Sequence, residues 1–322
     1  MRNAIPCFDA HCDTLSAAQR RGCSLRENSL HIDLMRLTRH APSAQVFALF
    51  LRPRGWNFAA GYDKPDCPYE TLKPAFDGLL DYALRAFDEN ADLVSLCRSA
   101  AQAREVFAEG RTAAFLAVEG AELLGCSEAA LRAAYESGVR LVNLPGNYPN
   151  ALSGSTQSGG GLTEKGRHFG RTAQALGVAV DLSHASDAAF WETLEIAEKP
   201  VLAGHSNARA LCPHPRNLTD EMFTALAKQG GVAGLNLCPD FLGENPDVET
   251  AAAHIEHFLA LGGEKAVCLG TDFDGIDGTP AGLSGTQDLP ALYECLLRKN
   301  HPESLVRDIF FHNLMAFLEK AL

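Results

Sequence analysis

The sequence of 322 residues predicts an α/β protein folded as a single (β/α)8 TIM-type barrel domain over residues 1–322. Three observations predict this fold. Short apolar runs recur along the chain, as in strands of a parallel sheet that is buried on both faces. Most of these runs are followed by a segment with the apolar spacing of a helix. No glycine fingerprint of a dinucleotide-binding sheet follows the first run, which favours a closed barrel over an open sheet.

The predicted strands are short apolar runs that end in polar residues. There are eight of them, the number that a barrel of this class requires. They are residues 4–8, 45–51, 113–118, 139–144, 178–182, 201–203, 232–237 and 266–269.

The predicted helices lie between and after these strands. In the first of them, apolar side chains from Leu72 to Phe87 recur at the spacing of one helical face. Gly262 and Gly263 mark the end of another, because glycine commonly terminates helices. The predicted helices are residues 72–87, 127–136, 163–176, 185–197, 219–228, 248–261 and 303–320.

The composition of the chain argues against some classes of binding partner and predicts a cellular location. The chain has 28 Lys and Arg against 40 Asp and Glu, and this net charge of -12 argues against a nucleic-acid partner. No run of 18 apolar residues is present, so we expect no membrane span. An apparent strand begins a few residues after Met1, which leaves no room for a signal sequence and predicts a cytoplasmic protein. The ten cysteines include no C-x-x-C pair, and we expect reduced cysteines, mostly in the core.

Metal-binding side chains follow five of the eight predicted strands. In a barrel of this class the active site lies at the carboxyl ends of the strands, so these side chains are expected to converge. The first strand leads into His11 and Asp13, which share one strand face because side chains alternate along a strand. The others lead into Glu119, Asp181 with His184, His205, and Asp272 with Asp274.

A set of six or more such groups is too large for one catalytic zinc, which usually takes three protein ligands and a water. They suit two ions that share a bridging carboxylate. Nitrogen and oxygen ligands favour zinc, although manganese or iron could also bind. Because two cations lower the pKa of a water between them, the implied reaction is hydrolysis.

A series of motifs runs along nearly the whole chain. They are Asp9-x-His11-x-Asp13-Thr14, Glu119-Gly120, Gly161-Leu162-Thr163-x-x-Gly166, Asp181-Leu182-Ser183-His184, His205-Ser206-Asn207-Ala208-Arg209, Pro215-Arg216-Asn217-Leu218-Thr219-Asp220, Gly230-Gly231-Val232, Asp272-Phe273-Asp274-Gly275 and Asn313. In order and spacing the set resembles the membrane dipeptidase (renal dipeptidase) family of zinc metallopeptidases. The resemblance implies an amidohydrolase-like dipeptidase.

The resemblance also implies a role for each ligand. His11 and Asp13 would bind one zinc, His184 and His205 would bind the other, and Glu119 would bridge the two. A hydroxide between the two Zn2+ ions would attack the peptide carbonyl. The family further suggests a homodimer and dipeptide substrates whose C-terminal residue is L or D.

Two more residues take a role from the same resemblance. Asp272 corresponds to the catalytic aspartate that moves a proton to the departing amine, although Asp274 shares its strand face. Arg216 matches the arginine that binds the substrate's C-terminal carboxylate, with a structural salt bridge as the alternative.

One position departs from the family pattern. The family carries Thr-His-Asn after the fourth strand, and Gly146 stands in the histidine's place. Tyr148 and His214 are candidates for the missing hydrogen-bond donor. Losing a donor to a developing oxyanion costs on the order of 10²–10³ in rate, so the departure leaves two alternatives to dipeptide cleavage open. One is hydrolysis of another small amide, such as an N-acyl amino acid or a lactam, and the other is a metal-bound protein without activity.

The remaining histidines are given no role in the predicted site. His254 and His257 lack the i, i+4 spacing of a helical zinc pair and are expected on a solvated face. His31, His40, His168, His301 and His312 are left unassigned. The segment 53–71, rich in Gly, Pro and aromatic residues, is expected to cover part of the active site.

Overall fold

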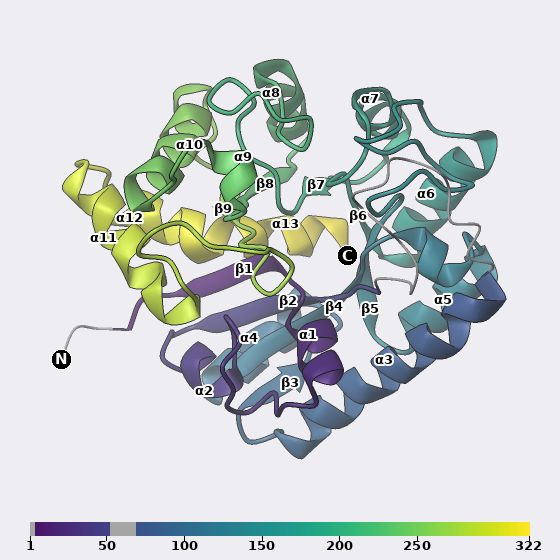
Figure 1. Ribbon diagram of the computed structural model, residues 1–322, viewed down its shortest axis with the longest axis horizontal. Helices are drawn as coiled ribbons and strands as arrows, with labels where there is room; N and C mark the ends of the chain where they lie inside the picture. The colour runs from purple at the N-terminus through teal and green to yellow at the C-terminus, as the bar shows by residue number, and fades with distance from the viewer. Residues whose placement is uncertain (1–3, 52–68) are drawn as a thin grey trace.

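A computed structural model of the chain describes residues 4–51 and 69–322. The strands form one parallel sheet, with the helices arranged around it (Figure 1). The strands are β1 Cys7–Cys12, β2 Ser43–Leu49, β3 Val94–Leu96, β4 Thr112–Val118, β5 Val139–Asn143, β6 Ala179–Asp181, β7 Leu202–Ala203, β8 Val232–Leu235 and β9 Val267–Leu269.

The sheet closes on itself through the pairing of β2 with β4. Their register runs from Ala44 opposite Ala113 to Leu49 opposite Val118. Going the other way round, β1, β9, β8, β7, β6 and β5 join β2 to β4 in that order. The predicted (β/α)8 fold is therefore confirmed, with all eight predicted strands in the barrel.

Strand β3 is an addition that the sequence did not predict. It pairs with the first part of β4, from Val94 opposite Thr112 to Leu96 opposite Ala114. The later part of β4, from Leu116, pairs with β5 instead. β3 has only three residues and two of them are partly exposed, so it lacks the continuous apolar run of a barrel strand.

The predicted helices are present, with one interruption. They are α3 Tyr69–Glu89, α5 Glu128–Glu136, α6 Glu164–Leu176, α7 Asp187–Ile196, α8 Asp220–Lys228 and α10 Val248–Ala260. The segment predicted as one helix at 303–320 is divided into α12 Glu303–Arg307, the π-helical turn η3 Asp308–His312 and α13 Asn313–Ala321. The helices not predicted are α1 Thr14–Arg21, α2 Leu34–Leu37, η1 Ala121–Leu124, α4 Ala100–Ala108, α9 Pro239–Leu242, η2 Thr286–Asp288 and α11 Leu289–Arg298.

Polar caps start several of the helices that follow barrel strands. The Thr163 side chain accepts a hydrogen bond from Gly166 N at the start of α6, and Thr219 accepts one from Met222 N at the start of α8. Such caps satisfy backbone N–H groups that have no partner within the helix. They fix where each loop at the carboxyl end of the barrel finishes.

Strand alternation divides the apolar side chains into two layers. Outward-facing residues pack under the helices, and inward-facing residues such as Phe8 and Phe115 fill the barrel. Phe8 stacks on Phe115 with ring centroids 5.7 Å apart, and Phe311 of η3 lies 6.0 Å from Phe8. Phe8, Phe115 and Phe311 form an apolar floor that closes one end of the barrel, so the polar chemistry lies at the other end.

The nine cysteines among the described residues are all free, as expected. Six are buried, and Cys23, Cys212 and Cys238 are partly exposed. No helix in the described part of the chain is long and apolar enough to cross a membrane.

Candidate metal centre and active site

The carboxyl ends of the barrel strands bring the predicted ligands together. His11 lies within β1, and Asp13 is the residue directly before helix α1. Glu119 comes directly after β4. His184 and His205 lie on the loops after β6 and β7. All five side chains are buried.

These side chains form two groups that share Glu119. In one group, His11, Asp13 and Glu119 each offer a ligand atom, and these atoms lie within 4.8 Å of one another. In the other, Glu119, His184 and His205 do the same. Glu119 Oε2 lies 3.3 Å from His11 Nε2, and Glu119 Oε1 lies 2.9 Å from His184 Nε2. One carboxylate oxygen thus faces each group, the arrangement expected of a bridge.

The polar atoms of this cluster fit a cation better than they fit one another. His11 Nε2, Asp13 Oδ1 and Glu119 Oε2 are buried without a hydrogen-bond partner. The Nε2 atoms of His184 and His205 lie only 2.9 Å apart. Leaving buried polar atoms without partners costs free energy. A divalent metal bound by these nitrogen and oxygen atoms would remove that cost.

The charges of the cluster support the same fit. Burial and the neighbouring Glu119 carboxylate hold the pKa of Asp13 well above its usual range. Burial opposes the protonation of His11, yet the Glu119, Asp272 and Asp13 carboxylates together raise its pKa to about 10. The site is therefore a concentration of negative charge that favours a positive occupant.

Of the two candidate aspartates, only Asp272 lies at this cluster. Its Oδ1 atom is 3.9 Å from His11 Nε2, and burial raises its pKa to about 6. Asp274 instead accepts hydrogen bonds from Thr14 Oγ1 at 2.6 Å and from the backbone N–H of His31 at 2.8 Å. Asp274 therefore secures the surrounding loops.

Two residues of the cluster have strained backbones. His184 has φ 72° and Asp272 has φ 60°, in the left-handed region. For residues other than glycine this conformation costs roughly 1–2 kcal/mol each. Such strain persists where the surrounding structure enforces it, commonly at functional sites.

Three buried polar residues hold the loops of the cluster in place. Asp9 accepts hydrogen bonds from Thr271 N and Thr271 Oγ1, joining β1 to the Asp272 loop. Asp181 Oδ1 accepts from Ser183 N and Gly204 N, joining the His184 and His205 loops. Asn236 Nδ2 donates to Asp272 Oδ2 at 2.9 Å and to His205 O at 3.2 Å. No sequence motif marks Asn236 as part of the site, because only the strand order places β8 beside the loops of β7 and β9.

Arg216 lies on the wall of the same site. Its Nη2 donates to His184 Nε2 at 3.1 Å, while Nη1 is buried without a partner. Within the part of the chain that the structure describes Arg216 makes no ion pair, and its role in binding a substrate carboxylate stays a prediction. A buried guanidinium with unused donors is suited to an anionic ligand.

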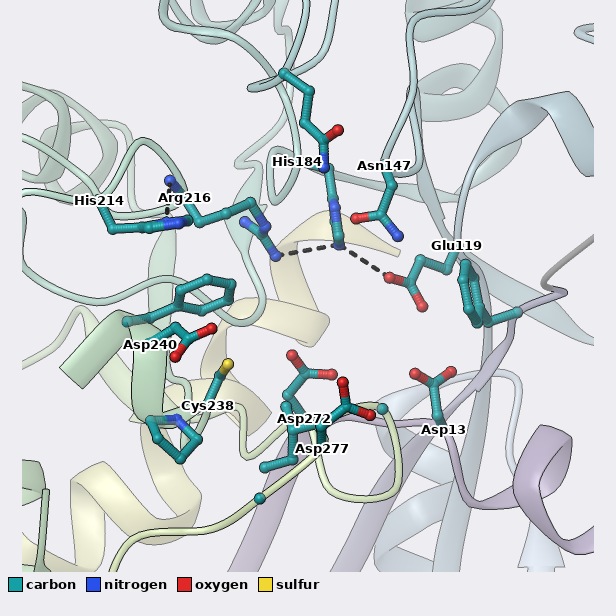
Figure 2. Close-up of a pocket in the computed structure, with 17 residues that line it drawn as sticks. Asp13, Glu119, Asn147, His184, His214, Arg216, Cys238, Asp240, Asp272 and Asp277 are labelled. Atoms are coloured by element: carbon teal, nitrogen blue, oxygen red, sulfur yellow. Dashed lines mark hydrogen bonds and ion pairs between the residues drawn. The ribbon is translucent and has the colours of Figure 1, made fainter. Parts of the chain in front are cut away.

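The cluster opens into a cavity of about 460 Å³. Figure 2 shows Arg216, His184, Glu119, Asp13 and Asp272 around this space. Asn147, Cys238, Asp240, Phe241 and Asp277 complete much of its wall. Of the segment 53–71 that we expected to cover the site, residues 53–68 lie outside the described residues.

The structure gives a physical reason for Gly146. A Cβ atom at this position would lie 2.5 Å from Glu122 Oε1, so the Glu122 carboxylate occupies the space of a side chain. Of the two candidate replacements, His214 lies beside Arg216, whose backbone N–H it accepts at 3.2 Å, and stacks on Phe241. Tyr148 is not among the residues that line the cavity.

The prediction that His254 lies on a solvated face is wrong. Its side chain is buried, accepts a hydrogen bond from Ala208 N and contacts Leu242 O at 3.1 Å. It shares the inner face of α10 with Ala251, Ile255 and Phe258, an apolar spacing that could have revealed it. His257 is partly exposed and pairs with Asp220 at 2.7 Å.

Comparisons with known proteins found a family, a relative and solved structures that are similar to this chain. The model of the membrane dipeptidase family (peptidase family M19) matches residues 1–321. A protein of Klebsiella pneumoniae, described as uncharacterized and from the pqqA 5' region, is 33% identical over 244 residues, which cover 71% of this chain and 90% of that protein.

Two solved structures are similar over almost their whole length. A metallopeptidase of Rhodobacter sphaeroides, liganded with a phosphinate mimic of the dipeptide L-Ala-D-Ala, has a TM-score of 0.90 and 27% identity, covering 99% of this chain and 100% of that chain. Dipeptidase AC, a metallopeptidase of family M19, has a TM-score of 0.87 and 28% identity, covering 99% of both chains.

Proposed function

Because this chain belongs to the membrane dipeptidase family of metallopeptidases, we propose that it hydrolyses L-L and L-D dipeptides at a centre that holds two zinc ions. The observation that carries the proposal is the pair of three-ligand groups that share Glu119. The family resemblance of the sequence is confirmed by the comparisons, and so is its prediction of a metallopeptidase. The zinc identity, the number of ions and the residue roles are our proposal.

His11, Asp13 and Glu119 would hold one ion, and Glu119, His184 and His205 would hold the other. When bound, the ions would polarise the scissile carbonyl and supply a water that ionises at neutral pH. The remaining work falls to residues of the chain itself.

Arg216 would bind the substrate's C-terminal carboxylate through its unpaired Nη1. This contact fixes the distance between the carboxylate and the scissile bond, which favours dipeptides over longer peptides. A C-terminal amide offers no charge to Arg216, so we expect a dipeptide amide to show a kcat/KM lower by roughly 10–100-fold than the free dipeptide. Arg216→Met should abolish that preference.

Asp272 would transfer a proton from the attacking water to the departing amine. As the attacking water forms a C–O bond, Asp272 accepts a proton, and it returns a proton to the amide nitrogen as the C–N bond breaks. The hydrogen bond from Asn236 fixes one oxygen of Asp272 and leaves Oδ1 turned toward the ligand cluster. The products are two amino acids, one with a new carboxylate and one with a new amine.

The bound ligand of the Rhodobacter sphaeroides relative supports acceptance of a D residue at the C-terminus. The test is kcat/KM for the zinc-loaded protein on a panel of L-L and L-D dipeptides, with a chelated sample as control. Chelator-sensitive cleavage supports the proposal.

A second candidate keeps the same machinery but changes the substrate. Gly146 leaves one wall without the family's histidine, which favours a small amide such as an N-acyl amino acid or a lactam. Faster cleavage of those compounds than of any dipeptide would select this candidate. Two bound zincs without turnover of any amide would leave the inactive metal-bound alternative. The single domain, the cytoplasmic location and the homodimer stay predictions.

A further inference from the structure

The loop after β5 brings an unused amide to the cavity. Asn147 lines the cavity together with Glu119 and His184, and Figure 2 shows its side-chain amide turned toward the same space as theirs. Among the described residues no hydrogen bond involves this amide. In Figure 2 Arg216 and Asn147 are drawn on either side of His184. Asn147 is thus placed to contact a ligand on the other side of His184 from the guanidinium.

Glu122 holds the loop that carries Asn147. Its two carboxylate oxygens accept from Gly146 N at 3.2 and 3.3 Å, and Oε2 also accepts from Asn150 Nδ2 at 2.7 Å. Asn150 Nδ2 donates as well to Leu144 O at 2.7 Å. One carboxylate therefore holds the backbone N–H of Gly146 on one side of Asn147 and the side chain of Asn150 on the other.

Side chains at two nearby positions would displace the Glu122 carboxylate from this arrangement. A Cβ on Gly146 or on Gly120 would collide with the Glu122 carboxylate. Gly120 also has φ 100°, which side-chain-bearing residues rarely adopt. Gly120, Glu122 and Gly146 thus form a matched set, and Glu122 does not itself line the cavity.

We propose that Asn147 donates a hydrogen bond to the carbonyl oxygen of the scissile amide, and that Glu122 is the positioning residue that aims it. This inference rests on the proposed amide hydrolysis. As the carbonyl carbon becomes tetrahedral, its oxygen gains negative charge, and a donor already fixed in place stabilises that charge. The interaction strengthens in the transition state, so it acts on kcat more than on KM.

The first test is Asn147→Ala and Asn147→Asp in the zinc-loaded protein. Both remove the donor, and the aspartate keeps the shape. We expect kcat to fall by about 10²-fold or more with KM changed only a few-fold. Zinc content should equal that of the parent. A kcat within threefold of the parent, with full zinc, would overturn the proposal.

The second test is a double-mutant cycle. Glu122→Ala should lower kcat in the parent but cost little more in Asn147→Ala, because both changes remove one interaction. Glu122→Gln keeps an oxygen acceptor and should restore most of the rate. Fully additive losses would show that Glu122 does not act through Asn147. If the parent itself cleaves no amide, the proposed function fails, which is distinct from normal turnover by Asn147→Ala.

Discussion

Glu119 is the residue on which the proposed metal centre depends most directly. Its two oxygens face different histidines, so neutralising it affects both metal positions. We expect Glu119→Gln to lower bound zinc from two ions to at most one per chain and kcat by at least about 10²-fold. Metal analysis and dipeptide turnover measure both. The control is Glu249→Gln, the same chemical change on the exposed face of α10; a variant of Glu119 that keeps two zincs and full activity would contradict the bridging role.

Glu122 makes a separate prediction about stability and pH. Burial raises its pKa from 4.5 to about 7, although hydrogen bonds from Asn150 and Gly146 lower it in part. The folded protein therefore holds this proton more tightly than the unfolded chain does. The stability contributed by the protonated form is fully present below about pH 4.5 and is lost as the pH rises through 7.

The measurement is Tm at pH 5 and pH 8 for the parent and for Glu122→Gln, which cannot ionise. Between these two pH values the parent should lose more Tm than the variant. Equal losses in the two proteins would show that Glu122 ionises normally.

The predicted metal ligands can be recognised from sequence patterns, but the residues that position their loops cannot. His11 and Glu119 stand at the ends of apolar runs, a place that barrel geometry marks as functional. Glu122 and Gly146 touch across 24 positions of sequence, and no local pattern marks such a contact. The prediction for His254 was wrong because its spacing from His257 does not report burial, whereas the apolar Ala251, Ile255 and Phe258 place it on the inner face of α10.

Hydrogen bonds between neighbouring loops position the predicted metal ligands. Asp181 joins the His184 and His205 loops through a single oxygen, Oδ1, which accepts both backbone N–H groups. Asp181→Ala removes that link and should weaken zinc binding by roughly 10–100-fold. Asp181→Asn keeps an oxygen at the same place and should bind zinc nearly as the parent does. Competition with a chelator measures both affinities, and equal weakening in the two variants would mean that charge matters more than the hydrogen bonds.

Strands were easier to predict than the elements outside the barrel. Barrel strands are buried on both faces and read as apolar runs, whereas β3 has one buried residue. The helix predicted at 303–320 contains the π-helical turn η3, where Ile309, Phe310 and Phe311 are all buried. An apolar run of this kind continues through the turn, so periodicity does not reveal it.

The whole molecule places apolar packing and polar chemistry at opposite ends of one barrel. Strand order was predictable because sequential strands of this fold lie side by side. β2 and β4 follow this rule because β3, which comes between them in sequence, lies outside the ring, and the neighbours that are far apart in sequence are the first and last strands, β1 and β9. The shape of the cavity was not predictable, because it depends on how the loops after all eight barrel strands meet in space.

The apolar floor of Phe8, Phe115 and Phe311 closes one end of the barrel and leaves only the other end open to solvent. Substrate then enters and products leave through the same opening of the cavity. If Arg216 binds the substrate's C-terminal carboxylate as proposed, the C-terminal amino acid product keeps that contact and competes with incoming dipeptide. We expect free amino acids to inhibit competitively in steady-state assays, and Arg216→Met to relieve that inhibition. The rate of hydrolysis would then depend on how quickly the product amino acids are removed from the surrounding solution.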